Sequence, residues 1–223
     1  SISPVFPTAF TQVVRTSSSS ATLQELQDIQ FASFGGAVHV NPSSPHSGTT
    51  YPNGTARQPV NNLADALAIL TERGLESIEV NGAVSIPTGL DFSGVRFTGT
   101  SAQKAQINVP DAATVDNGEY VECSLTGVLD GSAFVERCAI QNLTYVNGIV
   151  YNSGIGGTIT LGGNTLAAFI DCVSLVPGGG PSQTPTIDMG GSGNSLILRN
   201  YHGGVKLTNK TGNDPVSIDM MGG

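Results

Sequence analysis

The sequence predicts an all-β protein built as a parallel β-helix, a coil in which the short strands of successive turns stack on one another. Three observations support this fold class. Residues 75–151 hold a series of short β-forming runs, separated by turn dipeptides such as Asn-Gly and Asp-Gly. The segment TITLGG at 158–163 is echoed by TIDMGG at 186–191 and by SIDMMGG at 217–223. Each of the three cysteines closes a similar run of an aromatic, a β-branched and a charged residue.

A repeat unit of this size is too small to bury its own apolar face, so it gains a core by stacking on its neighbours. A jelly roll or a β-sandwich also consists of many short strands. Those folds are marked by steady apolar and polar alternation and by hairpin turns. The repeated segments and the shared cysteine contexts favour the coil. A chance echo is the alternative, because Gly, Thr and Ile are common residues.

Residues 1–21 are predicted to form an extended arm and linker, because Pro4, Pro7 and a run of serines leave no periodic pattern. Apolar side chains are nevertheless interspersed in this arm. They are Val5, Phe6, Phe10, Val13 and Val14. Two interpretations stay open: the arm becomes ordered on a partner that these side chains contact, or it is plainly disordered.

Residues 22–36 predict a short helix and a connector. Thr22 and Glu25 have the spacing of a capping box, apolar residues follow at helical spacing to about residue 33, and two glycines at 35–36 end the run. The β-helix domain is predicted to span 37–223. It begins with a strand at 37–40 and a loop at 41–58, and loops of that length are often functional or packed by their own side chains.

A second helix is predicted inside this domain, at about 63–73. Asn61 or Asn62 provides its N-cap, an apolar face follows at helical spacing, and Gly74 ends it. We expect this capping helix to cover the open N-terminal end of the coil, where a strand edge would otherwise be free to pair. No helix is predicted after Gly74. Strands are predicted there at 77–80, 83–86, 96–98, 106–109, 120–125, 134–140, 143–145 and 148–151.

The composition excludes several kinds of partner. The chain of 223 residues carries a net charge of −8 and no basic cluster, which argues against binding to nucleic acid or to an anionic membrane surface. The sequence contains no apolar run of about 18 residues, so no membrane-spanning segment is predicted, and no signal peptide is visible. No cofactor is predicted. The histidines at 39, 46 and 202 lack the spacing of metal ligands.

The three cysteines, Cys123, Cys138 and Cys172, are an odd number without a C-x-x-C pair. This is a poor basis for a disulfide framework or a zinc site. The simplest interpretation is that cysteine recurs at an inward position, where it packs as a small apolar side chain. A reactive thiol is the sharper alternative, but two of the three sites have no basic neighbour.

The N-terminal part of the domain carries several spaced sequence blocks. SGTTYPNGT lies at 47–55, QPVNNLADA at 58–66 and IEVNG at 78–82. Over about residues 34–82 these blocks resemble a family of tailed-bacteriophage structural proteins that have a pectate-lyase-like, right-handed β-helix. The resemblance implies a virion protein, assembled in the host cytoplasm. It further implies a part of a tail, a fibre or a capsid decoration, commonly present as a homotrimer.

The fold also occurs in polysaccharide lyases, in glycoside hydrolases and in phage tailspikes that cut host polysaccharide. Glycoside hydrolysis needs two carboxylates about 5 to 9.5 Å apart. If the chain is an enzyme, the catalytic candidates are Asp171, Glu136 and Asp188. We expect Asp171 and Glu136 to line up on one outer face, because each lies near a cysteine, and Asp188 to stack with Asp219. The simpler interpretation is a charged outward position in each strand.

Two functional hypotheses follow. The first is a virion structural protein that assembles through its N-terminal arm and its β-helix faces, as a homotrimer and with other virion proteins. The alternative is an adhesin or depolymerase that engages host surface carbohydrate. Trp is absent, and the chain has five Tyr and eight Phe. This favours the structural role, because sugar platforms favour exposed aromatic rings.

Overall fold

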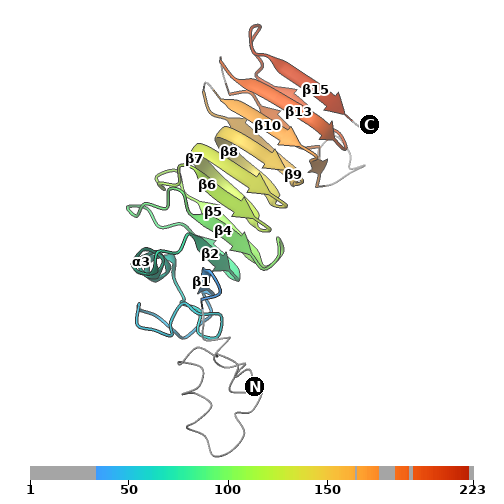
Figure 1. Ribbon diagram of the computed structural model, residues 1–223. Coiled ribbons are helices and arrows are strands. Elements are labelled where there is room, and N and C mark those ends of the chain that lie inside the picture. The colour runs from blue at the N-terminus through green and yellow to red at the C-terminus, as the bar shows by residue number, and fades with distance from the viewer. Residues whose placement is uncertain (1–33, 164, 176–183, 191–192, 221–223) are drawn as a thin grey trace, which may run out of the picture.

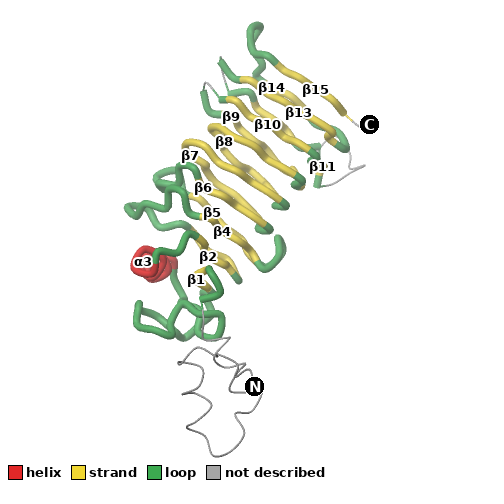
Figure 2. The backbone as a smooth tube through the Cα atoms, in the orientation of Figure 1, coloured by secondary structure: helices red, strands yellow, loops and turns green. Residues whose placement is uncertain are grey.

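The computed structural model describes residues 34–163, 165–175, 184–190 and 193–220. In these residues the chain forms a rod-shaped solenoid of about seven turns, with one helix and with strands that pair in parallel from turn to turn (Figure 1). Figure 2 shows the strands stacked along the rod, with loops at the edges of the stack. The predicted all-β, parallel β-helix class is therefore confirmed. The predicted arm at 1–21 and the predicted helix at 22–33 lie outside the described residues.

The helix is α3 (Leu63–Arg73), as predicted. The strands in chain order are β1 (Ala37–Val40), β2 (Ser77–Val80), β3 (Gly82–Ser85), β4 (Arg96–Gly99), β5 (Ala105–Val109), β6 (Gly118–Val121), β7 (Ser124–Glu136), β8 (Ala139–Tyr151), β9 (Gly154–Leu161), β10 (Leu166–Ile170), β11 (Val173–Ser174), β12 (Thr186–Asp188), β13 (Ser195–Tyr201), β14 (Lys206–Thr208) and β15 (Val216–Met220).

One sheet runs the whole length of the rod, and we call its outer surface the long face. Its strand order is β1-β2-β4-β6-β7-β8-β10-β13-β15. β7 and β8 are 13 residues long and bend around corners. Their last residues pair within the long face, whereas their first residues pair with β5 and β9 on the other sides of the coil. Side chains alternate inward and outward along each strand, so the inward ones form one continuous core.

A column of residues in the left-handed conformation turns the chain out of the long face. They are Glu122, Arg137, Asn152, Asp171 and Asn200, with φ between 46° and 56°. Hydrogen bonds join neighbouring turns at this corner, for example from Arg137 N to Tyr151 O at 3.1 Å. Asn and Asp tolerate positive φ better than other residues with a Cβ, so Glu122 and Arg137 adopt the corner conformation at a higher cost.

The residue after each corner points into the core. Cys123, Cys138, Ser153, Cys172 and Tyr201 occupy this column, and each is at most 3% exposed. The prediction that cysteine recurs at an inward position is therefore confirmed. Ser153 fills the same position in an intervening turn, where its Oγ accepts a hydrogen bond from Cys138 N at 3.0 Å and donates one to Tyr151 O.

Helix α3 packs at the N-terminal end of the rod, next to β1 and β2 (Figure 1). Asn62 caps its first turn by accepting from Asp65 N, and Gly74 ends it with φ 64°. Its buried face consists of Leu63, Ala66, Ile69 and Leu70. Among the described residues, no helix has the length and apolar character that a membrane crossing requires.

The pairing edge of β1 is covered by the loop at 41–60 through backbone hydrogen bonds. His39 N donates to Gly54 O at 2.8 Å, and Val60 N donates to His39 O at 3.0 Å. The helix was expected to cover this end. Instead, the loop forms the hydrogen bonds with the edge of β1, and the helix buries apolar side chains beside it. Gly54 lies where a Cβ would be 2.9 Å from Ile69 Cδ1, so the loop packs tightly on the helix.

The segments that echo one another in the sequence are only partly a structural repeat. Ile159 in β9 pairs with Ile187 in β12, which confirms the first two copies. The prediction of a third copy at 217–223 is wrong, because Ile218 lies in β15 and pairs with Leu198 on the long face. The expected stacking of Asp188 with Asp219 fails for the same reason. An inward isoleucine between two outward polar residues looks alike on every side of a β-helix, so the motif alone does not identify the side.

Candidate functional site

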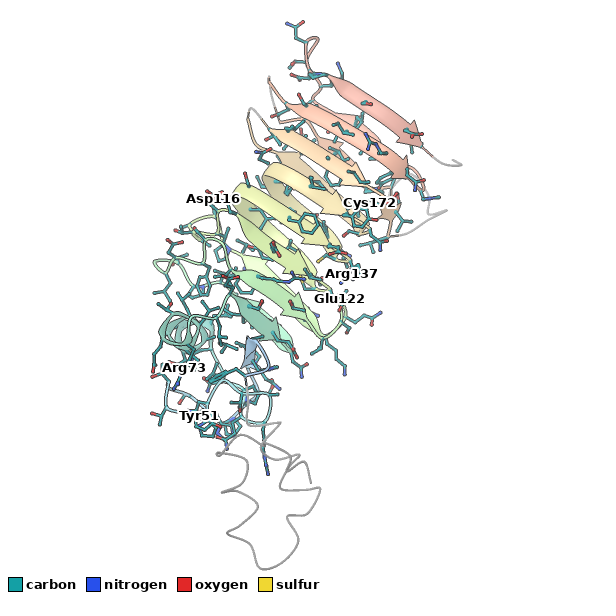
Figure 3. All side chains as sticks on the ribbon, viewed as in Figure 1. Tyr51, Arg73, Asp116, Glu122, Arg137 and Cys172 are labelled. Carbon is teal, nitrogen blue, oxygen red and sulfur yellow. The ribbon has the colours of Figure 1, made fainter. Side chains whose placement is uncertain are left out.

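The acidic residues beside the corner of the long face are held by one arginine. Arg137 Nε donates to Glu122 Oε1 at 2.9 Å, and the same guanidinium forms an ion pair with the Glu136 carboxylate. Figure 3 shows Arg137 and Glu122 next to each other at this edge of the rod. Both carboxylates therefore have a cationic partner on the protein surface.

Asp171 and Glu136 do not occupy equivalent positions. In the register of the strands, Glu136 pairs with Tyr151, which in turn pairs with Ile170, so Asp171 belongs to the corner column one residue further on. β8 lies between their strands, which separates the two residues by about 10 Å along the rod axis. Asp171 accepts a hydrogen bond from Asn200 Nδ2 at 2.6 Å. The expectation that Asp171 and Glu136 align is wrong.

Asp188 lies on another side of the coil. Its strand pairs with β9 and β14, and its Oδ1 accepts hydrogen bonds from Gly190 N and Asn209 Nδ2, both at 2.9 Å. The three catalytic candidates therefore do not converge on one point. In the described part of the chain, no three His, Cys, Asp or Glu side chains gather as metal ligands would.

Two of the three buried thiols, Cys123 and Cys172, are poor nucleophiles. Cys123 Sγ and Cys138 Sγ are 3.5 Å apart, and this hydrogen bond together with burial raises the pKa of the Cys123 thiol. Burial also raises the pKa of the Cys172 thiol to about 11. At neutral pH these two groups are therefore protonated thiols, and thiolate chemistry has no support at either of them.

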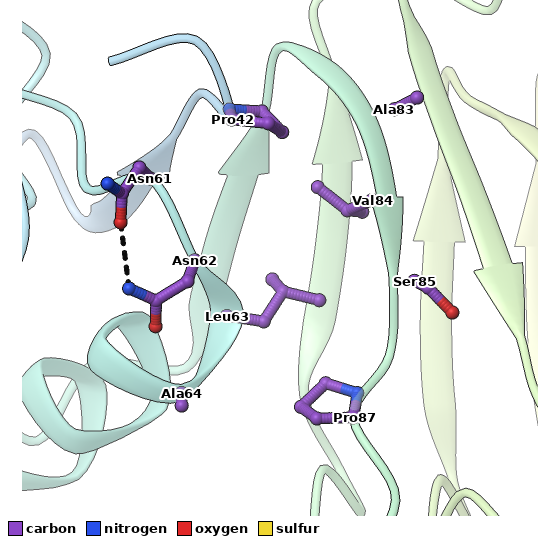
Figure 4. A pocket seen from close by; sticks show the side chains of 9 residues that line it. All are labelled: Pro42, Asn61, Asn62, Leu63, Ala64, Ala83, Val84, Ser85 and Pro87. Carbon is purple, nitrogen blue, oxygen red and sulfur yellow. Dashed lines mark hydrogen bonds between the residues drawn. The ribbon is translucent and has the colours of Figure 1, made fainter. Parts of the chain in front are cut away.

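A pocket of about 280 Å³ lies between the N-terminus of α3 and β3 (Figure 4). Its polar wall is formed by Asn61 and Asn62. Asn62 Nδ2 donates to Asn61 Oδ1 at 2.8 Å and to Asp65 Oδ2 at 2.7 Å. The two asparagine side chains bond to each other, and the remaining lining residues are small and mainly apolar. The pocket thus lies between the loop region and the coil and has no charged lining residue that could take part in chemistry.

The strongest surface feature is a group of exposed apolar side chains in the middle of the long face. Phe134, Ile149, Tyr151 and Leu166 are 37%, 43%, 38% and 53% exposed, and we call them the central patch. They come from the neighbouring strands β7, β8 and β10, and Phe134 pairs directly with Ile149. A hollow of about 260 Å³ adjoins the patch beside Glu119 and Phe134.

Sequence reasoning missed the central patch. In chain order its members are separated by corners and by inward residues, and Phe134 stood in the same cysteine context as the buried Tyr120. The signal that could have found them is the length of that context, which holds one residue more before Cys138 than before Cys123. The five predicted partner-binding residues Val5, Phe6, Phe10, Val13 and Val14 lie outside the described residues.

No family model matches this chain, and neither a curated protein nor a solved structure is significantly similar to it.

Proposed function

We propose that this chain is a structural subunit of a tailed-bacteriophage virion, where it forms part of a tail or a capsid decoration. The sequence blocks between 47 and 82 carry this proposal through their resemblance to such proteins. The same resemblance implies that the coil is right-handed and that the particle is assembled in the host cytoplasm.

The contacts within these blocks support the proposal by giving the motif residues a joint structural role. Gly48 N donates to Asp65 Oδ2 at 2.6 Å, and Asn53 Nδ2 donates to Ser47 O at 2.7 Å. Val60 forms backbone bridges in the same unit. The blocks thus build the end of the rod that residues 1–33 adjoin in the sequence. A subunit anchored through an N-terminal arm needs a well-formed unit at this position.

In the proposed role, the arm attaches the subunit to other virion proteins through Val5, Phe6, Phe10, Val13 and Val14, while the coil projects or packs against copies of itself. The resemblance implies three copies. An outer face with an apolar centre supports self-association, because monomeric proteins rarely expose large contiguous apolar patches.

Quantitative mass spectrometry of density-purified particles tests the proposed role. The particles are produced in a host that carries the coding sequence, once intact and once with residues 1–21 deleted. We expect the intact chain to co-purify at a fixed ratio to the major capsid protein and the truncated chain to stay in the soluble fraction. An intact chain that stays soluble contradicts the structural role.

The alternative role in cutting host polysaccharide has its own test. The purified chain is incubated with surface polysaccharide of the host, and reducing and unsaturated sugar ends are measured. We expect no release. Turnover that Asp171→Asn or Glu136→Gln abolishes would replace the structural role with an enzymatic one.

A further inference from the structure

The outer surface of the long face has a regular order along the rod. Starting from β8 at the centre, β7 and β10 are one strand away, β6 and β13 are two, and β4 and β15 are three. The central patch occupies the three innermost strands. Small or half-buried apolar side chains extend it toward the C-terminus, namely Ala168, Ile170 and Ile197. Toward the N-terminus the outward Val121 is only 2% exposed.

Charged side chains flank the patch with opposite order at its two ends. Toward the N-terminus, Glu119 in β6 is followed by Arg96 in β4, and the two side chains form an ion pair at 3.2 Å on the surface of one copy. Toward the C-terminus, Arg199 in β13 is followed by Asp219 in β15. Glu136 in β7 adds a second negative charge on the N-terminal side. Counted outward from β8, the charges are therefore negative, negative and positive on one side, and positive then negative on the other.

We propose that two copies of this chain pair through their long faces, as antiparallel rods related by a two-fold axis that runs along β8. This operation lays each strand on the one at the same distance from β8 in the other direction. β6 then faces β13 of the second copy, which places Arg199 over Val121, beside Glu136 in β7 and diagonal to Glu119. β4 faces β15 of the second copy, which places Asp219 over Thr98 and diagonal to Arg96. Each contact occurs twice, as in any isologous interface.

The apolar side chains complement one another in the same arrangement. β7 faces β10 of the second copy, which lays the large ring of Phe134 over the small side chain of Ala168. Ile149 and Tyr151 meet their own counterparts on the axis. Large side chains thus face small ones away from the axis, as close packing between two sheets requires.

Parallel pairing of the same faces is less favourable. It sets every strand against its own counterpart, so Glu119 of one copy lies beside Glu119 of the second, and Arg199 beside Arg199. Like charges that lie beside one another repel, and this repulsion disfavours the parallel orientation. The charge order therefore selects the antiparallel pair, and two copies close the interface. This number differs from the three copies that the resemblance implies.

The contact area is sufficient for a specific but moderate interface. The seven strands from β4 to β15 span about 30 Å along the rod, at about 4.8 Å a strand, and about five residues of each strand span about 17 Å. The two copies together bury about 1,000 Å², which lies at the lower limit for specific association. We therefore expect a micromolar dissociation constant.

Sedimentation equilibrium of the full chain tests the pairing, with circular dichroism to verify the fold of each variant. We expect a dimer mass for the unsubstituted chain, and a dissociation constant raised more than tenfold by Ile149→Lys. Val173→Lys is the matched control, since Val173 is equally exposed but lies in β11 on another side of the coil. A monomer or a trimer at all concentrations overturns the proposal, as does a control that weakens pairing as much.

A charge exchange tests the orientation. Arg199→Glu and Glu119→Arg each weaken the dimer, by about tenfold over the two symmetric contacts, and the double variant restores it. Asn147→Cys, in β8 on the long face, gives a dimer that a bifunctional thiol reagent cross-links, because sheets packed face to face lie about 10 Å apart, whereas Gln141→Cys in the part of β8 on another side does not. Absence of restoration together with absence of the Asn147→Cys link overturns the antiparallel arrangement.

The pairing extends the proposed structural role, but it is measured separately. A chain that is incorporated in particles yet monomeric in solution overturns the pairing alone. A dimer that is absent from particles overturns the virion assignment alone.

Discussion

Replacing Asn194 by alanine should destabilise the C-terminal turns of the coil strongly. The side chain is fully buried, its Oδ1 accepts a hydrogen bond from Thr165 N at 2.8 Å, and its Nδ2 donates to Met189 O. It thus joins the turns that contain β9, β10 and β12. Alanine leaves one buried N–H donor and one buried carbonyl acceptor without these partners.

Each lost partner costs on the order of 1–3 kcal/mol when the remaining group stays buried. The two groups together predict a loss of about 3 kcal/mol in the free energy of unfolding. For a chain of this length, that loss lowers the Tm by roughly 6–12 °C. The effect should be measured by thermal and urea unfolding, monitored by far-ultraviolet circular dichroism.

Asn108→Ala is the matched control. Asn108 is exposed, and among the described residues its side chain bonds only to the exposed hydroxyls of Ser85 and Thr126, so its loss should change the free energy of unfolding by less than about 0.5 kcal/mol. A destabilisation below about 1 kcal/mol for Asn194→Ala, or one equal to the control, would refute the reasoning that this side chain holds neighbouring turns together.

Three further predictions concern the acidic loop, the thiols and the packing at the helix. Hydrogen bonds from Thr211 lower the pKa of Asp214, so the stabilisation from its carboxylate is complete above the unfolded pKa of about 4 and is lost as the pH falls through the lower folded value. The Tm difference between the parent and Asp214→Asn should therefore vanish in strong acid. A difference that stays constant with pH contradicts this prediction. The thiols of Cys123 and Cys172 should not react with a disulfide reagent in the native chain at mildly alkaline pH, whereas all three cysteines should react after denaturation, and rapid native labelling of either would be contrary to their burial. Gly54→Ala should lower the free energy of unfolding by about 1–2 kcal/mol more than Gly89→Ala, since both glycines have φ 84° but only Gly54 lacks room for a Cβ, and equal melting curves would exclude this packing effect.

The sequence was sufficient for features that local chemistry determines. Helix α3 was predicted at its observed bounds, because its cap at Asn62 and its end at Gly74 are set by nearby residues. The inward column was found from Cys123, Cys138 and Cys172, because a corner followed by a small apolar residue recurs with its own local pattern. The sequence did not indicate that Ser153 and Tyr201 continue that column, since chemically different side chains fill the same space.

Features that depend on register were beyond the sequence. The echo of GNTL at 163–166 in GNSL at 193–196 aligns Leu166 with Leu196, but Leu166 pairs with Ser195. Leu166 therefore points outward and Leu196 inward. A shift of one residue reverses the face of every side chain, and the turns that precede these strands set that shift. The central patch was missed for this reason, because its membership depends on which residues of three strands point outward.

The candidate carboxylates illustrate the same limit. Glu136 and Asp171 share a cysteine context, but the additional Arg137 places Glu136 in the strand and leaves Asp171 at the corner. One inserted residue thus separates two positions that appear equivalent in the sequence. The simpler interpretation, outward charged residues with surface partners, agrees with the ion pairs and hydrogen bonds that these carboxylates form.

Immunogold labelling of particles tests the central claim most directly. Antibodies raised against the purified chain are applied to intact particles from a host that carries the coding sequence, and the labels are located by electron microscopy. The structural role predicts gold at one defined part of the particle, such as the tail or the capsid surface, and none on particles made without the coding sequence. Unlabelled particles, with all of the chain recovered in the soluble fraction, would contradict it.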